Sequence, residues 1–93
     1  MYSEYLKMKI YIYDGSEGQN AQEIARLNIQ TELKIWQPNT SFSVKREGYN
    51  LMIRWTGNPT VEVVKEITNK YCDPVSNIKS YGFAYNIFLE RTR

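Results

Sequence analysis

Two neighbouring segments in the middle of the chain, 41–47 and 49–56, alternate between apolar and polar residues. Their apolar positions are Phe42, Val44, Leu51, Ile53 and Trp55. A period of two is typical of β-strands that bury one face. Gly48 supplies the turn between the segments. Because this connection is too short for a crossover, we expect the two strands to pair antiparallel.

Two other segments carry apolar residues at the 3.6-residue spacing of an amphipathic helix. The first is predicted from Asn20, an N-cap with Glu23 three residues later, to about Trp36. Its apolar side consists of Ala21, Ile24, Ala25, Ile29, Leu33 and Trp36. The second helix is predicted to start with Asn58 as its cap and Pro59 at its first position. Its buried stripe consists of Val61, Val64, Ile67 and Tyr71.

Further strands are predicted at 7–13 and 81–90, which makes the order β-α-β-β-α-β. Two split βαβ units of this kind predict the ferredoxin-like α+β plan, a two-layer sandwich. In it, a four-stranded antiparallel sheet carries two helices on one face. Right-handed crossovers would place the first and third strands at its centre. The 93 residues are expected to form a single domain, 1–93.

The composition argues against catalysis. The chain has no histidine and a single cysteine, Cys72, so the usual metal sites, triads and intrachain disulfides are absent. We therefore expect no enzyme, no metal and no cofactor. No run of about 18 apolar residues occurs, so no membrane span is expected. A lone cysteine fits a reducing cytoplasm, and a net charge of +2 does not by itself indicate nucleic acid.

The outward positions of the first three strands form a candidate binding surface. If Ile10 and Ile12 face the helices, the opposite face carries Lys9, Tyr11, Tyr13, Lys45, Met52 and Arg54. Aromatic and basic side chains on an open sheet suit single-stranded nucleic acid, through stacking and phosphate contacts. Tyrosine, methionine and arginine are equally suited to docking a protein. Tyrosines also serve as amphipathic cover on a half-exposed sheet, and a homodimer through this face or an edge strand is a further alternative.

Short motifs between residues 21 and 71 carry a resemblance to a known family. They are Leu33-Lys34 with Pro38, Phe42-Ser43-Val44-Lys45, Ile53-Arg54-Trp55-Thr56, Pro59-Thr60, Val64 and Ile67. Together they resemble the small α/β "large polyvalent protein-associated" domains of phages and conjugative elements. Gly57-Asn58-Pro59 stands where that family has Asp-Gly-Pro. No role of that aspartate is therefore carried over to this chain.

The resemblance implies a setting in mobile elements but no particular chemistry. Proteins in that setting are often delivered or expressed to blunt host defence. We therefore expect a small inhibitor, of the anti-CRISPR or anti-restriction type, acting in the host cytoplasm. Its partner would be a host defence protein or nucleoprotein complex, bound stoichiometrically. The alternative is an accessory protein that binds single-stranded nucleic acid. These expectations rest on family association and on the missing catalytic residues.

Overall fold

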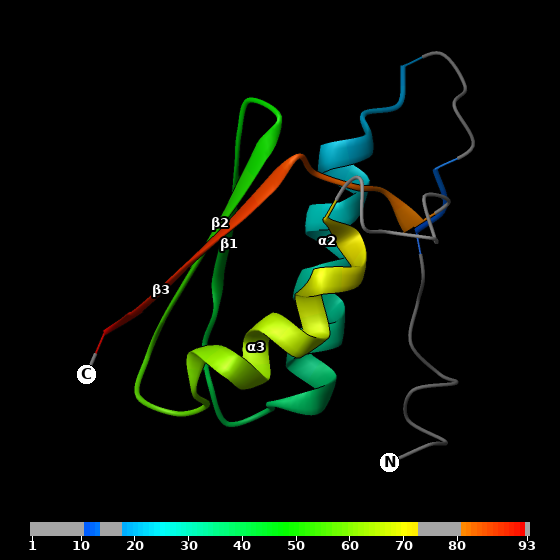
Figure 1. Ribbon diagram of the computed structural model, residues 1–93. Coiled ribbons are helices and arrows are strands. Elements are labelled where there is room, and N and C mark those ends of the chain that lie inside the picture. The colour runs from blue at the N-terminus through cyan, green and yellow to red at the C-terminus, as the bar shows by residue number, and fades with distance from the viewer. Residues whose placement is uncertain (1–10, 14–17, 73–80, 93) are drawn as a thin grey trace.

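The protein is α+β, and its described residues form two α-helices and a small sheet. The computed structural model describes residues 11–13, 18–72 and 81–92. Its elements are α2 (Ala21–Trp36), β1 (Ser43–Glu47), β2 (Asn50–Thr56), α3 (Val61–Thr68), the 3-10 turn η1 (Asn69–Tyr71) and β3 (Asn86–Thr92). Both helices lie on the same side of the sheet (Figure 1). The predicted cap of the first helix is confirmed, since Asn20 Oδ1 accepts a hydrogen bond from the Glu23 N–H at 2.9 Å.

The sheet is mixed, with the order β1-β2-β3. β1 pairs antiparallel with β2, placing Val44 beside Ile53, whereas β2 and β3 run parallel, placing Ile53 beside Leu89. The predicted ferredoxin-like order and fully antiparallel sheet are therefore wrong. α3 serves as a crossover that returns the chain alongside β2. β3 thereby occupies the position that the ferredoxin-like plan reserves for the first strand.

The predicted first strand does not extend through Tyr11–Tyr13, and residues 7–10 lie outside the described ranges. The backbone of Tyr11 is instead held by Asn28 of α2. Its N–H donates to Asn28 Oδ1 at 2.7 Å, and its carbonyl accepts from Asn28 Nδ2 at 2.8 Å. The same Nδ2 donates to the Tyr81 carbonyl at 2.9 Å. One fully buried amide thus supplies the backbone partners that a neighbouring strand would have supplied.

The last strand begins five residues later than predicted, at Asn86 instead of Tyr81. The segment before it crosses the start of α2 at close range. Gly82 has a φ of +82°, and a Cβ added there would lie 2.6 Å from the Ala21 carbonyl oxygen. The Phe83 N–H donates to that carbonyl at 3.2 Å. Glycine permits both the left-handed backbone and the close approach to the helix.

The second helix begins later than predicted, at Val61, because Pro59 belongs to the preceding loop and its carbonyl binds a side chain. The Pro59 carbonyl accepts a hydrogen bond from Trp55 Nε1 at 2.7 Å, and Pro59 itself is buried. Thr60, not Asn58, is the N-cap, and its hydroxyl accepts from the Val63 N–H at 3.4 Å. The buried indole therefore fixes the loop that leads into α3.

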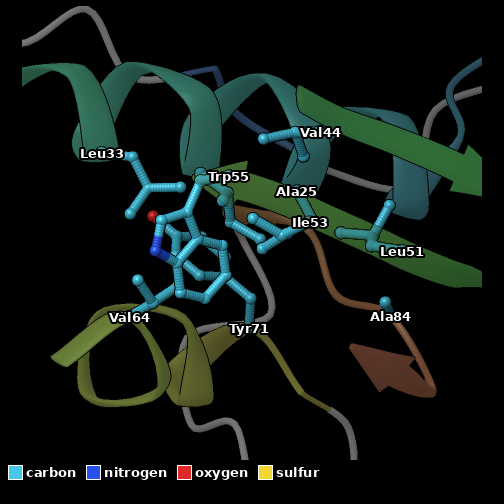
Figure 2. Close-up of a cluster of buried hydrophobic side chains, with 10 residues drawn as sticks. Ala25, Leu33, Val44, Leu51, Ile53, Trp55, Val64, Tyr71 and Ala84 are labelled. Carbon is cyan, nitrogen blue, oxygen red and sulfur yellow. The ribbon is translucent and has the colours of Figure 1, made fainter. Parts of the chain in front are cut away.

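The core lies between the sheet and the two helices. Figure 2 shows Trp55 of β2 between Leu33 of α2 and Val64 of α3. The central strand contributes Leu51, Ile53 and Trp55, which are all buried. The complete cluster is Ala25, Ile29, Leu33, Val44, Leu51, Ile53, Trp55, Val64, Tyr71 and Ala84. α2 also buries three polar residues that its apolar pattern did not predict, namely Gln22, Asn28 and Glu32.

Candidate functional site

The face of the sheet opposite the helices is the candidate site. Leu51, Ile53 and Trp55 point toward the helices, so the alternate residues of β2 point away from them. Within the described ranges, no helix covers that side (Figure 1). We call this surface the open face. The strand registers place on it Ser43, Lys45, Glu47, Asn50, Met52, Arg54, Thr56, Asn86, Phe88, Glu90 and Thr92.

One row of the open face combines a cation with two large apolar side chains. The register sets Lys45 of β1 beside Met52 of β2, and Met52 beside Phe88 of β3. Phe88 is 48% exposed, although its neighbours Ile87 and Leu89 are only partly accessible. Residues opposite one another on adjacent strands have Cβ atoms about 5 Å apart, so Met52 is a direct neighbour of both Lys45 and Phe88.

The adjoining rows are polar. Arg54 Nε donates to Glu90 Oε1 at 2.6 Å, and the two side chains are 48% and 59% exposed. Such a solvated ion pair contributes little to stability, typically about 0–1 kcal/mol. On the other side of the apolar row, Asn86 Nδ2 donates to Asn50 Oδ1 at 3.3 Å. The apolar row is therefore framed by hydrogen-bonding groups, as in the rim of a protein interface.

The structure brings together three of the six residues predicted for the binding surface. Lys45, Met52 and Arg54 share the open face as expected, and Lys9 lies outside the described ranges. Tyr11 and Tyr13 do not share it. Tyr11 is attached to α2 through Asn28.

The rings of Tyr13 and Phe83 form a T-shaped pair, with centroids 6.0 Å apart. The prediction of one shared face is wrong for Tyr11 and Tyr13. Residues 11–13 do not form a strand, so alternation does not determine which way their side chains point.

Phe88 and Glu90 belong to the open face but were absent from the predicted set. The signal is present in the sequence, because Phe88 and Glu90 alternate with Ile87 and Leu89 and so lie on the opposite face of the strand. What the alternation does not reveal is the neighbour. Only the parallel pairing of β3 with β2 places Phe88 next to Met52 and Glu90 next to Arg54.

A shallow groove of about 680 Å³ lies at one end of the open face. It is formed by the segment before β1 and the loop between β2 and α3. Arg91 anchors that loop to β3, since its Nε donates to the Gly57 carbonyl at 2.6 Å. The lining is rich in hydroxyl and amide groups: Asn39, Thr40, Ser41, Phe42, Ser43, Arg54, Trp55, Thr56, Asn58 and Thr92. This lining has hydrogen-bonding capacity but contains no carboxylate, thiol or imidazole for acid–base or nucleophilic chemistry.

The other charged pairs of the described residues involve α2. Glu32 is buried, accepts a hydrogen bond from the Tyr71 hydroxyl at 2.9 Å and is paired with Lys70. On the exposed side of α2, Arg26 donates to both carboxylate oxygens of Glu23, at 2.9 and 2.6 Å. This hydrogen bonding holds the pKa of Glu23 below its usual value and raises the pKa of Arg26. The Glu32 contacts join α2 to η1, whereas the Glu23–Arg26 pair lies within α2, and neither is on the open face.

Among the described residues, no group of three or more Cys, Asp or Glu side chains gathers as metal ligands would. None of the described helices is both long and apolar enough to cross a membrane.

The chain was also compared with known proteins. The sequence model of a family described as "Large polyvalent protein associated domain 29" matches residues 19–88. This match extends from the cap of α2 into β3, so it covers both helices and the whole of β1 and β2. No curated protein and no solved structure matches the chain.

Proposed function

The chain belongs to the large polyvalent protein associated domain 29 family, and on that premise we propose that it is a small binding protein of a phage or other mobile element which inhibits a host defence system. Inhibition is stoichiometric, by occupying a surface of a defence protein or nucleoprotein complex in the host cytoplasm. The family relationship supports the setting, and the open face supports the mode of action. No catalytic step is required of the chain.

The row Lys45–Met52–Phe88 is the observation that carries this proposal. Methionine and aromatic residues are enriched in protein interfaces. The residues that contribute most of the binding energy cluster at a desolvated centre inside a polar rim. An exposed phenylalanine beside methionine supplies such a centre. The Arg54–Glu90 pair supplies part of the rim. A rigid sheet also presents these side chains without the ordering cost of a loop.

The open face favours a protein partner over single-stranded nucleic acid. Platforms for single strands stack successive bases on several aromatic rings. Tyr11 is bonded to α2 and Tyr13 packs against Phe83. Phe88 is therefore the one aromatic ring on the described part of the open face. Arg54 is already paired with a carboxylate. The nucleic-acid alternative therefore becomes an outcome of the experiment.

The proposal is tested by plaque assays on hosts that carry CRISPR or restriction immunity against the infecting phage. We expect expression of the protein to restore plaque formation on at least one such host. The double variant Met52→Ala, Phe88→Ala should lose this effect while its circular dichroism melt stays close to that of the wild type. Exposed Lys34→Ala on α2 is the matched control and should remain active.

Two outcomes would overturn the proposal. One is that the wild-type protein protects phage in none of the immune hosts. The other is binding of single-stranded oligonucleotide that falls steeply with salt and depends on the open face, which would favour the alternative.

A further inference from the structure

The outer edge of β3 presents backbone groups that no described strand pairs with. β3 pairs with β2 on one side, and among the described residues no strand pairs with its other side. The Thr92 carbonyl accepts from the Gly57 N–H at 2.7 Å, so Thr92 directs its backbone groups toward β2. Because this direction alternates along a strand, Ile87, Leu89 and Arg91 direct their N–H and carbonyl groups outward.

A groove runs beside this edge, between β3 and α3. Its volume is about 310 Å³, and Val61, Lys65 and Thr68 of α3 line it opposite Ile87 and Leu89 of β3. Ile87 and Leu89 belong to the helix-facing side of the sheet, yet both remain partly accessible. α3 is only eight residues long and leaves their outer sides uncovered. An apolar strip therefore lies directly alongside the free backbone edge.

The geometry of the strip fits the side chains of an added strand. Alternate residues of a strand lie about 6.6–6.8 Å apart on one face, which is also the spacing of Ile87 and Leu89. A strand paired with β3 would thus place alternate side chains beside these two residues. The single charged residue in the groove lining is Lys65, which is exposed, and the lining holds no carboxylate. The groove consequently complements an apolar segment that carries one acidic residue.

From these observations we propose that the edge of β3 binds an extended segment of a partner protein by β-strand addition. The segment pairs with the outward groups of Ile87, Leu89 and Arg91, places apolar side chains beside Val61, and presents a carboxylate to Lys65. Main-chain hydrogen bonds provide the affinity and the groove provides the selectivity, as in other modes of strand addition. The groove borders the open face at Asn86 and Phe88, but its backbone partners are Ile87, Leu89 and Arg91, and the proposal does not rest on the function proposed for the open face.

A second copy of the chain fits this edge less well. An antiparallel pairing of two β3 strands centred on Leu89 sets Arg91 of one copy opposite Ile87 of the other. The Arg91 guanidinium donates to the Gly57 carbonyl of its own chain. To fill the partner's groove it would have to leave that carbonyl and approach the ammonium of Lys65. Like charges at short range oppose such pairing. The charge of the groove therefore selects an acidic partner segment over a second copy.

The first test titrates the ¹⁵N-labelled protein with a capped hexapeptide in which valine alternates with threonine and one glutamate. We expect saturable amide shifts and slower hydrogen exchange at Ile87, Leu89 and Arg91. The proposal fails if these amides do not respond at about 1 mM peptide, where weak binding is still measurable. It also fails if they shift with protein concentration alone, because a second copy would then occupy the edge.

The second test removes one outward N–H. Leu89→Pro deletes the donor but leaves the pairing with β2, and proline is tolerated on an edge strand whose N–H faces solvent. We expect peptide affinity to fall about five- to tenfold, in line with one lost hydrogen bond. Leu89→Val, the matched control, shortens the side chain but keeps the N–H, so it should reduce the peptide affinity less than Leu89→Pro does. Equal affinities of the two variants would overturn the proposal.

A charge exchange keeps the proposal testable if the proline variant does not fold. Lys65→Glu should weaken binding of the glutamate peptide. It should strengthen binding of the same peptide with lysine in place of glutamate. Unchanged preference between the two peptides would contradict the proposal. Met52→Ala, on the open face and outside the groove lining, should bind the glutamate peptide like the wild type. Failure of the edge site and failure of the open face are thus separated.

Discussion

Replacing Asn28 by alanine is the most direct test of how the N-terminal segment is held. The Asn28 side chain is fully buried and makes three hydrogen bonds, two with the backbone of Tyr11 and one with the Tyr81 carbonyl. It joins segments that are 17 and 53 residues away from it in sequence. Asn28→Ala leaves one N–H and two carbonyls without these partners, while α2 keeps its helical propensity.

The magnitude follows from the number of bonds and their surroundings. Each net hydrogen bond contributes about 0.5–1.5 kcal/mol, so three of them would contribute roughly 1.5–4.5 kcal/mol. Tyr11 and Tyr81 are only partly buried, so water can replace some of what is lost. We therefore expect the free energy of unfolding to fall by about 2–3 kcal/mol. For a domain of this size that corresponds to a decrease in Tm of roughly 10–20 °C.

Urea denaturation followed by circular dichroism measures the loss, and hydrogen exchange locates it. The Tyr11 amide should lose its protection in Asn28→Ala, whereas the amides of β2 should keep theirs apart from the global decrease. Lys34→Ala, at an exposed position of the same helix, is the control and should change stability by less than about 0.5 kcal/mol. If Asn28→Ala costs no more than Lys34→Ala, the assigned role of the buried amide is wrong.

Three further substitutions test the packing and the charge pairs. Gly82→Ala should destabilise the protein by roughly 2–6 kcal/mol, because the new Cβ meets the α2 backbone at a positive φ; an unchanged urea midpoint would contradict this. Glu32→Gln should lower the free energy of unfolding by about 1–3 kcal/mol, less than for a fully buried pair because the Lys70 side chain is 33% exposed. If the loss is no greater than for an exposed glutamate, the structural role assigned to Glu32 is wrong. The pKa of Glu23, measured by NMR, should lie below 4.5 and return toward it in Arg26→Ala; because the folded-state pKa is lowered, the stabilisation is present above about pH 4.5 and is lost as the pH falls through the folded value.

Half of the candidate site was accessible from the sequence. The alternation in the hairpin placed Lys45, Met52 and Arg54 on one face, because each of these strands carries its own pattern of buried residues. The same argument failed for Tyr11 and Tyr13. A run of alternating residues shows that a segment could form a strand, but not that another strand is available to pair with it.

The amino-acid sequence by itself determined the local elements: α2 with its cap, the β1–β2 hairpin, and the α+β class with both helices on one side. These follow from periodicity, turn residues and capping, which act over a few neighbouring positions. Only the tertiary structure decided that β3 lies parallel to β2 and that Asn28 replaces a strand partner for Tyr11. Both outcomes depend on which distant segments compete for the same backbone groups. That competition is settled by packing across the whole chain, and no local pattern records it.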